Sequence, residues 1–267
     1  MNDGVQSRVS HGAQRMSSTR SQLGRQIACC ILGCAAAYGQ DSSDLLQRMQ
    51  SALGGARIFQ VRDVDWKVRA KVWDGSGHEA GFAIRRERII LPYCSRKDQE
   101  MHISKEQVLH TLFYFDGRSG WGSFADMAGF KDTPVAALGG PELMMVQKEV
   151  RGFWLNLWRA QNYEVSVCAP NTLRFVDKED NSNVTELALA PDTWLPLRSG
   201  ELCKDAAKAA RGNQGSILEW LAVDGIKVPK HTLSYHAGQL VADIETVAVK
   251  LNTGMKREDL AQPPDKQ

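Results

Sequence analysis

The stretch from residue 64 to residue 72 alternates strictly between apolar and charged side chains, and this pattern constrains the fold most. Val64, Trp66, Val68, Ala70 and Val72 fall on one side of an extended strand, with charged residues between them. Such alternation is typical of an antiparallel strand with one buried face and one face in water. The chain must therefore build a sheet whose apolar face is covered by other elements.

Further strands are predicted on both sides of one long helix. That helix is expected from residue 139 to about residue 160, because Pro141 suits a first helical turn and large apolar residues recur at helical spacing after it. A shorter helix is predicted over residues 42–53, capped by Ser42 or Ser43 and ended by two glycines. The other periodic segments are strands, at residues 81–91, 100–103, 109–115, 164–168, 172–177, 184–190, 195–200, 217–223, 231–235 and 239–250.

This order of elements excludes the repeated βαβ units of a parallel sheet. We predict an α+β fold in which about ten strands form one curved antiparallel sheet. An open sheet of that size curls strongly because its strands twist. The expected architecture is a half-open β-barrel, with helices covering the concave face.

The first 39 residues have the pattern of a signal peptide. Arg20 and Arg25 precede an uncharged apolar run over residues 27–37, which is too short to span a bilayer as a permanent helix. Small residues follow this run, so cleavage is expected between Gly39 and Gln40. Met16 is an alternative start. The segment ending at Cys34 also loosely resembles a lipobox, so lipidation of Cys34 is a second route, and a buried N-terminal helix is a third interpretation.

The predicted organisation is therefore a signal peptide over residues 1–39, one domain over residues 40–260 and a disordered tail over residues 261–267. We expect the domain to be exported to the periplasm and to contain no transmembrane span. Residues 1–39 hold four arginines and one aspartate, which leaves 29 basic and 30 acidic residues in the remainder. This near-neutral balance gives no basic patch for nucleic acid.

Three cysteines remain after the predicted cleavage, Cys94, Cys168 and Cys203. They lie far apart and form no Cys-x-x-Cys pair, so the sequence predicts no metal site and no thioredoxin-like motif. In an oxidising compartment two of them could pair and leave one odd thiol. The sequence does not choose the pair, and three unpaired cysteines are an equal alternative.

No common catalytic motif is present, and we expect no enzymatic activity. The chain has no Gly-x-Ser-x-Gly elbow, glycine-rich nucleotide turn, phosphate loop or His-Glu-x-x-His motif. His102 and His110 lie in neighbouring predicted strands, and a chance surface pair explains them better than a hydrolase site. Glu186, Asp243 and Glu245 are expected at solvated strand positions.

Large aromatic residues concentrate on the predicted sheet and the long helix. An ordinary filled core is one interpretation. The sharper interpretation is an incompletely filled core, because a curved sheet under an aromatic helix can enclose an apolar cavity for an acyl chain. The sequence does not decide which side of the strand at residues 109–115 faces inward. The predicted cavity wall consists of Trp66, Val68, Phe113, Phe115, Trp154, Leu157 and Trp158.

Several segments resemble the outer-membrane lipoprotein carriers of the LolA/LolB-like superfamily, especially its exported, poorly characterised branch. These are residues 44–55 ending in ALGG, Asp116-Gly117 with Trp121 after them, residues 193–198 (TWLPLR), residues 223–229 (VDGIKVP) and residues 249–252 (VKLN). The resemblance implies a half-open antiparallel barrel with helices plugging its mouth, an apolar lipid cavity, no catalysis and no cofactor. The arginine and the lid that the carriers use to hold their cargo have no counterpart that we can map.

The leading hypothesis is therefore a periplasmic carrier or binding protein for a lipid or lipoprotein acyl chain. The alternative is an envelope interaction module with the same fold and a filled core, whose partners would be envelope proteins.

Overall fold

A thirteen-stranded antiparallel sheet dominates the structure, a computed structural model that describes residues 41–126, 129–204 and 212–263. Gln40–Gln267 form one structural unit. The predicted signal peptide, its cleavage site and Cys34 lie outside the described residues. The antiparallel α+β fold is confirmed, and the large sheet is curved and not closed.

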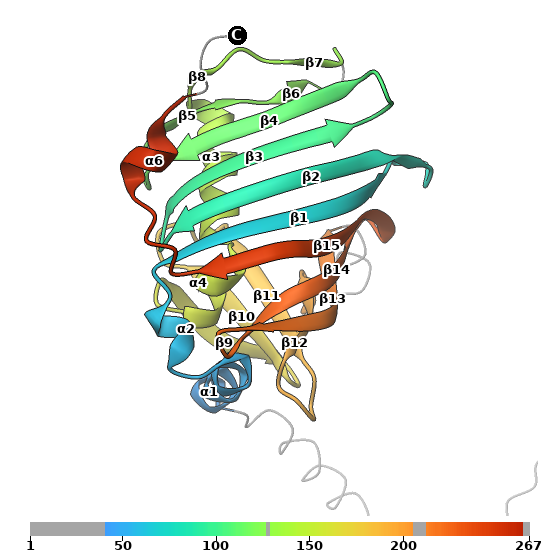
Figure 1. The fold of residues 1–267 in the computed structure, drawn as a ribbon. Helices are drawn as coiled ribbons and strands as arrows, with labels where there is room; N and C mark the ends of the chain where they lie inside the picture. The colour runs from blue at the N-terminus through green and yellow to red at the C-terminus, as the bar shows by residue number, and fades with distance from the viewer. Residues whose placement is uncertain (1–40, 127–128, 205–211, 264–267) are drawn as a thin grey trace, which may run out of the picture. The chain divides into compact units, whose positions relative to one another are not determined.

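The strands follow the order β8-β5-β4-β3-β2-β1-β15-β14-β13-β12-β11-β10-β9. Pairing between β1 and β15 joins the two halves of the sheet, and Figure 1 shows these strands side by side. A separate pair is formed by β6 (Ala125–Asp126) and β7 (Lys131–Asp132). The strands of the large sheet are β1 (Asp63–Trp73), β2 (Glu79–Ile90), β3 (Cys94–His102), β4 (Val108–Phe115), β5 (Gly120–Ser123), β8 (Ala136–Ala137), β9 (Tyr163–Ala169), β10 (Thr172–Asp177), β11 (Val184–Leu189), β12 (Pro196–Gly200), β13 (Asn213–Val223), β14 (Ile226–His236) and β15 (Gln239–Leu251).

Thirteen strands replace the predicted ten or so because short strands give no periodic signal. The strand β5 is the sequence Gly-Trp-Gly-Ser, and β8 contains only two alanines. Both become strands by pairing, since Trp121 and Gly122 of β5 lie opposite Ala137 and Ala136 of β8. Tertiary context, not local propensity, determines these two elements.

The first helix, α1 (Ser42–Leu53), is capped by a residue one position earlier than predicted. The carboxylate of Asp41 accepts a hydrogen bond from the backbone N–H of Ser43 at 3.0 Å. Gly54 has a φ of 139° and ends the helix, as the two glycines predict. The short helix α2 (Arg57–Gln60) follows directly.

The single helix predicted over residues 139–160 is wrong, because the segment forms two helices. α3 (Gly140–Arg151) and α4 (Trp154–Arg159) are separated at Gly152 and Phe153, and Phe153 has an extended ψ of 132°. The buried amide of Asn156 holds this break, since its Nδ2 donates to the carbonyls of Pro92 and Val150. The apolar periodicity continues across the break because both helices bury residues under the same sheet.

Helices α1 to α4 pack on one face of the sheet in two clusters. We call this the inner face; it carries Trp66 and Phe113, and the outer face carries Asp65 and Lys67. The larger cluster joins α1, α2 and α4 to strands β1, β2, β10, β11, β14 and β15. The smaller cluster joins Val146 and Val150 of α3 to β4. Helices α1 to α4 therefore cover the inner face.

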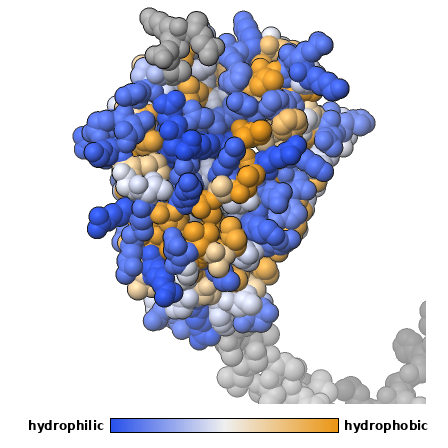
Figure 2. Space-filling model, in the orientation of Figure 1, coloured by the Kyte–Doolittle hydropathy of each residue, from blue (hydrophilic) through white to orange (hydrophobic). Residues whose placement is uncertain are grey.

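The outer face is mostly polar and carries one short helix. In Figure 1 this face is toward the viewer, with α6 (Arg257–Ala261) in front of it and α3 behind it. The indole nitrogen of Trp121 donates to the carbonyl of Ala261 at 3.0 Å. Figure 2 shows hydrophilic residues over most of this face, with a strip of apolar residues across it. Residues 264–267 of the predicted disordered tail lie outside the described residues.

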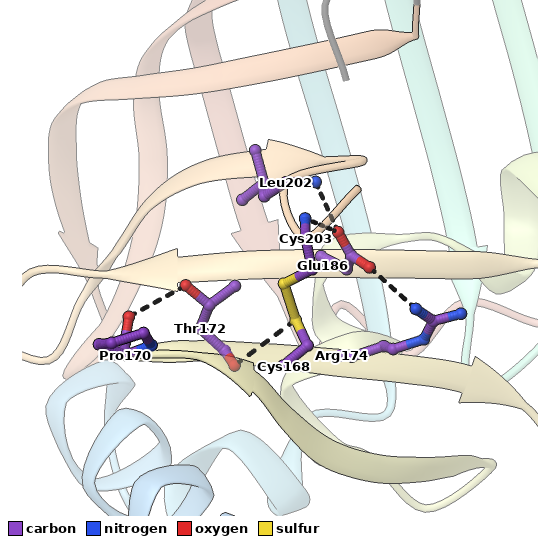
Figure 3. The surroundings of a disulfide bond; sticks show 7 residues. All are labelled: Cys168, Pro170, Thr172, Arg174, Glu186, Leu202 and Cys203. Carbon is purple, nitrogen blue, oxygen red and sulfur yellow. Dashed lines mark hydrogen bonds and ion pairs between the residues drawn. A yellow bond between two sulfur atoms is a disulfide. The ribbon is translucent and has the colours of Figure 1, made fainter. Parts of the chain in front are cut away.

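A disulfide joins Cys168 at the end of β9 to Cys203, and Cys94 is a buried free cysteine. Figure 3 shows Glu186 beside this bridge. The prediction of a solvated Glu186 is wrong, because this side chain is buried and accepts hydrogen bonds from the backbone N–H groups of Leu202 and Cys203. The segment after β12 folds over β11 and shields Glu186 from water. The alternation of residues within β11 cannot predict this contact, because it depends on a different segment of the chain.

Among the described residues, none of the helices combines the length and the apolar character that crossing a bilayer requires.

Candidate functional site

Three of the seven predicted wall residues meet in an aromatic cluster, which we define as Trp66, Phe153, Trp154, Trp158 and Trp220. The ring centroids of Trp154 and Trp158 are 4.4 Å apart, and those of Trp66 and Trp154 are 6.3 Å apart. Trp158 is only 2 % exposed. These rings pack directly against one another, so this part of the inner face is filled by side chains.

Two further wall residues, Phe113 and Phe115, lie in the other cluster under α3. Each is 1 % exposed, and both pack with Val146 and Val150 of α3. Their neighbours Leu112 and Tyr114 are only half-buried. The orientation of this strand, which the sequence left open, is thus resolved with Phe113 and Phe115 facing inward.

The last two predicted residues are also buried. Leu157 on α4 belongs to the larger core cluster, and Val68 on β1 is 2 % exposed. The structure therefore divides six of the seven residues between two clusters, places Val68 in neither, and does not gather the seven around one cavity. The larger cluster contains Leu157 and Trp158, with Trp66 and Trp154 packed against it. The smaller cluster contains Phe113 and Phe115.

A pocket of about 1130 Å³ opens beside Phe113, and we call it the α3 pocket. It lies between α3 and the inner side of strands β3, β4, β5 and β8. Apolar parts of its wall come from Phe113, Phe124, Leu138 and Met145. Of the seven predicted residues, only Phe113 lines this pocket.

Gly122 shapes the floor of the α3 pocket. It lies opposite Phe113 in the register of β4 and β5. A Cβ atom on Gly122 would lie 2.9 Å from the ring of Phe124 and 3.1 Å from a methyl group of Leu138. The missing side chain therefore allows both apolar groups to close over the strand at this point.

Polar groups of β3 and β4 also face the α3 pocket, and the sequence interpretation missed them. Lys97 Nζ lies 2.6 Å from Glu149 Oε1 of α3 and 5.7 Å from the centroid of the Phe113 ring. Gln99 and Thr111 are partners across β3 and β4 and line the same pocket. One sequence signal could have indicated this polar contact. Glu149 lies three positions after Val146 and next to Val150, so it falls on the apolar side of its helix, where a charged residue needs a partner.

A second pocket, of about 1190 Å³, lies largely over the outer face; we call it the outer trough. Ile84, Leu112 and Trp121 supply apolar surface there, and Lys67 and Glu100 supply charge. Gln99, Thr111 and parts of residues 133–137 line both pockets. The exposed segment 133–137 therefore forms a wall between the α3 pocket and the outer trough.

The predicted histidine pair does not form a shared site. The ring of His102 stacks on Phe82 with centroids 4.3 Å apart. His110 Nδ1 instead lies 2.8 Å from Asp132 Oδ2 at the surface. Each histidine thus has a different partner, and neither contacts the other.

One group of metal-ligand side chains exists among the described residues. The ligand atoms of Cys168, Glu186 and Cys203 lie within 4.8 Å of one another. Both sulfur atoms are bonded to each other, and Glu186 binds backbone N–H groups and Arg174. These partners use the groups that a metal ion would need.

No protein-family model matches the sequence, and no curated protein matches it. Solved structures do match. A DUF1329 family protein from Desulfovibrio piger has a TM-score of 0.53 and 11 % identity, covering 81 % of this chain and 96 % of its own. A domain named for outer-membrane lipoprotein sorting, from Vibrio parahaemolyticus, has a TM-score of 0.50 and 11 % identity, covering 81 % and 94 %. The chain has a LolA-like fold.

Two segments that carry the sequence resemblance meet in this LolA-like fold. Asp224 and Gly225 of the VDGIKVP segment form the turn between β13 and β14, with φ values of 51° and 77°. A Cβ atom on Gly54, from the ALGG segment, would lie 3.0 Å from the Gly225 carbonyl oxygen. A glycine at position 54 therefore lets the end of α1 approach this hairpin closely.

Proposed function

We propose that this chain is a non-catalytic carrier or binding protein for a lipid or lipoprotein, and that it holds an acyl chain in the α3 pocket. The observation that carries the proposal is the pocket itself. Its volume of about 1130 Å³ slightly exceeds the range of about 300–1,000 Å³ that is usual for small-molecule sites. Phe113, Phe124, Leu138 and Met145 offer the apolar contacts that an acyl chain requires.

Apolar contact alone supplies enough free energy for such binding. Each buried methylene contributes about 0.8 kcal/mol, so ten methylenes contribute on the order of 8 kcal/mol before the costs of association. Ring and thioether side chains also adapt to irregular apolar shapes. In this proposal Phe113 touches the acyl chain, five of the other predicted residues hold α3 and α4 against the sheet, and Val68 is a buried residue of β1.

The fold supports the same proposal at a coarser level, since one similar structure is named for lipoprotein sorting. Export to the periplasm is part of the proposal, through a signal peptide over residues 1–39 or an anchor at Cys34. The cargo then lies in a compartment where acyl chains need protection from water.

The test compares two variants of neighbouring residues on α3. Met145 lines the α3 pocket, whereas Met144 is 58 % exposed and does not line it. Binding of the methyl ester of pyrene-dodecanoic acid to the full chain is measured by fluorescence. Met145→Glu places a charge beside the acyl chain and is expected to weaken binding roughly tenfold or more. Met144→Glu is the matched control and should change binding less than about twofold.

A second candidate function follows from the filled aromatic cluster. Trp154 and Trp158 pack without space for a ligand between them, which suits an envelope interaction module with a solid core. Failure of the full chain to bind the ester would favour this module and remove the carrier proposal.

A further inference from the structure

The charges around the α3 pocket restrict the kind of acyl compound that it takes. Among the described residues, three charged side chains line the pocket: Lys97, Glu142 and Glu149. Their formal charges sum to −1. An anionic ligand therefore meets a slightly negative wall, and a neutral ligand meets no such penalty.

Lys97 is not free to receive an anion. Its ammonium is 2.6 Å from Glu149, and its side chain is only 11 % exposed. A ligand carboxylate that took this ammonium would leave Glu149 unpaired at a position that is 33 % exposed. The ligand carboxylate would also lie close to the negative charge of Glu149. Exchange of one carboxylate for another thus gains nothing and adds repulsion.

Uncharged hydrogen-bonding groups lie next to this ion pair. Gln99 and Thr111 are directly opposite each other on β3 and β4, and both are half-buried. Thr111 Oγ1 accepts a hydrogen bond from the backbone N–H of Ala125 at 3.3 Å, so its own proton remains to be donated. An amide N–H and a hydroxyl on the wall of the same pocket are both donors, which the carbonyl oxygen of an ester or an amide can accept from.

We infer that the α3 pocket selects acyl chains whose carboxyl group is esterified or amidated, and discriminates against free fatty acids. This inference rests on the proposed function, because it specifies the ligand class of the same site. Discrimination comes from the Lys97–Glu149 pair, in which Glu149 neutralises the one cation among the described lining residues, together with the charge of Glu142.

The experiment uses two probes of equal chain length, pyrene-dodecanoic acid and its methyl ester, with the full chain at pH 7.5. Wild type is expected to bind the ester at least about tenfold more tightly than the acid. Glu149→Gln removes the anionic partner of Lys97 while keeping a hydrogen-bonding side chain. It should shift the acid-to-ester affinity ratio at least about fivefold toward the acid.

Glu142→Gln is the second variant, because Glu142 is exposed in the first turn of α3 and its replacement leaves the Lys97–Glu149 pair intact. It should shift the ratio in the same direction by about two- to threefold. Glu164→Gln on the edge strand β9 is the matched control, since it removes an exposed charge away from the pocket. The ratio should stay at the wild-type value in this control.

The outcomes separate the inference from the proposed function. Ester binding with equal or tighter acid binding would overturn the inference and leave the carrier proposal standing. A ratio that Glu149→Gln and Glu142→Gln both leave unchanged would also overturn it. Absence of binding by either probe would overturn the proposed function, and the inference with it.

Discussion

Lys97 of β3 and Glu149 of α3 form an ion pair with 2.6 Å between Nζ and Oε1. The pair ties the sheet to the helix that covers it, at the edge of the α3 pocket. Lys97 has little contact with water, so its charge depends on Glu149 for compensation. This contact is expected to contribute to the stability of the region, and the inferred ligand preference of the pocket depends on it together with Glu142.

Replacement of Glu149 by leucine should destabilise the protein by about 2 kcal/mol, because it leaves the Lys97 ammonium buried without a partner. The double variant Lys97→Met, Glu149→Leu should lose less than the sum of the two single changes, by about 1 kcal/mol or more. Urea denaturation followed by tryptophan fluorescence measures all four free energies. Strict additivity would show that the two side chains are not coupled.

Replacement of Trp158 by alanine should cost about 3–5 kcal/mol, since this buried ring contacts both Trp154 and Trp220. Leu218 on β13 provides the matched control because it is large, apolar and 53 % exposed. Leu218→Ala should change stability by less than about 0.5 kcal/mol. Equal effects of the two changes on the urea midpoint would argue against a packed aromatic cluster.

Reduction of the Cys168–Cys203 disulfide should destabilise the protein by about 3–4 kcal/mol, as expected for a bridge between residues 35 positions apart. Unfolding is measured with and without reductant in wild type and in the Cys168→Ser, Cys203→Ser variant. The variant should not respond to reductant. A wild type that is equally insensitive would contradict the pairing and favour three unpaired cysteines.

Asp65 should contribute stability that disappears in acid. Hydrogen bonds from Arg86, at 2.7 and 2.8 Å, lower the pKa of this carboxyl below its ordinary value of 3.8. The folded state therefore takes up the proton less readily than the unfolded state, so the contribution is present above about pH 4 and is lost as the pH falls below it.

The Asp65 contribution is expected to stay below about 1 kcal/mol, because Arg86 is half exposed and water screens the pair. Comparison of wild type with Asp65→Asn by urea denaturation at pH 6 and pH 3 measures it. The stability difference should shrink at pH 3. A difference of the same size at both pH values would exclude this carboxyl as its source.

Much of the fold could be predicted because its long strands alternate. The alternation over residues 64–72 predicts β1, whose observed span is Asp63–Trp73. In contrast, β3 was predicted only over residues 100–103, because Lys97 and Gln99 face inward while Arg96 and Asp98 face outward. A strand that is polar on both faces has no alternation to detect.

The candidate site was harder to predict for the same reason. The sequence analysis predicted a cavity wall made mainly of large aromatic residues. In the structure, the rings of Trp66, Trp154 and Trp158 pack on one another instead. The α3 pocket is lined in part by the polar β3 and by the short strands β5 and β8. Each of these is fixed by tertiary packing, so only Phe113 of the predicted wall was found to line the pocket.

Native mass spectrometry of the purified full chain tests the central claim most directly. Wild type should carry an additional mass equal to an acyl compound, and lipid extraction should release a compound that accounts for that mass. Met145→Glu should lose this mass, and Met144→Glu should retain it. Wild type without any bound acyl compound, even after incubation with the pyrene-dodecanoyl ester, would contradict the carrier function.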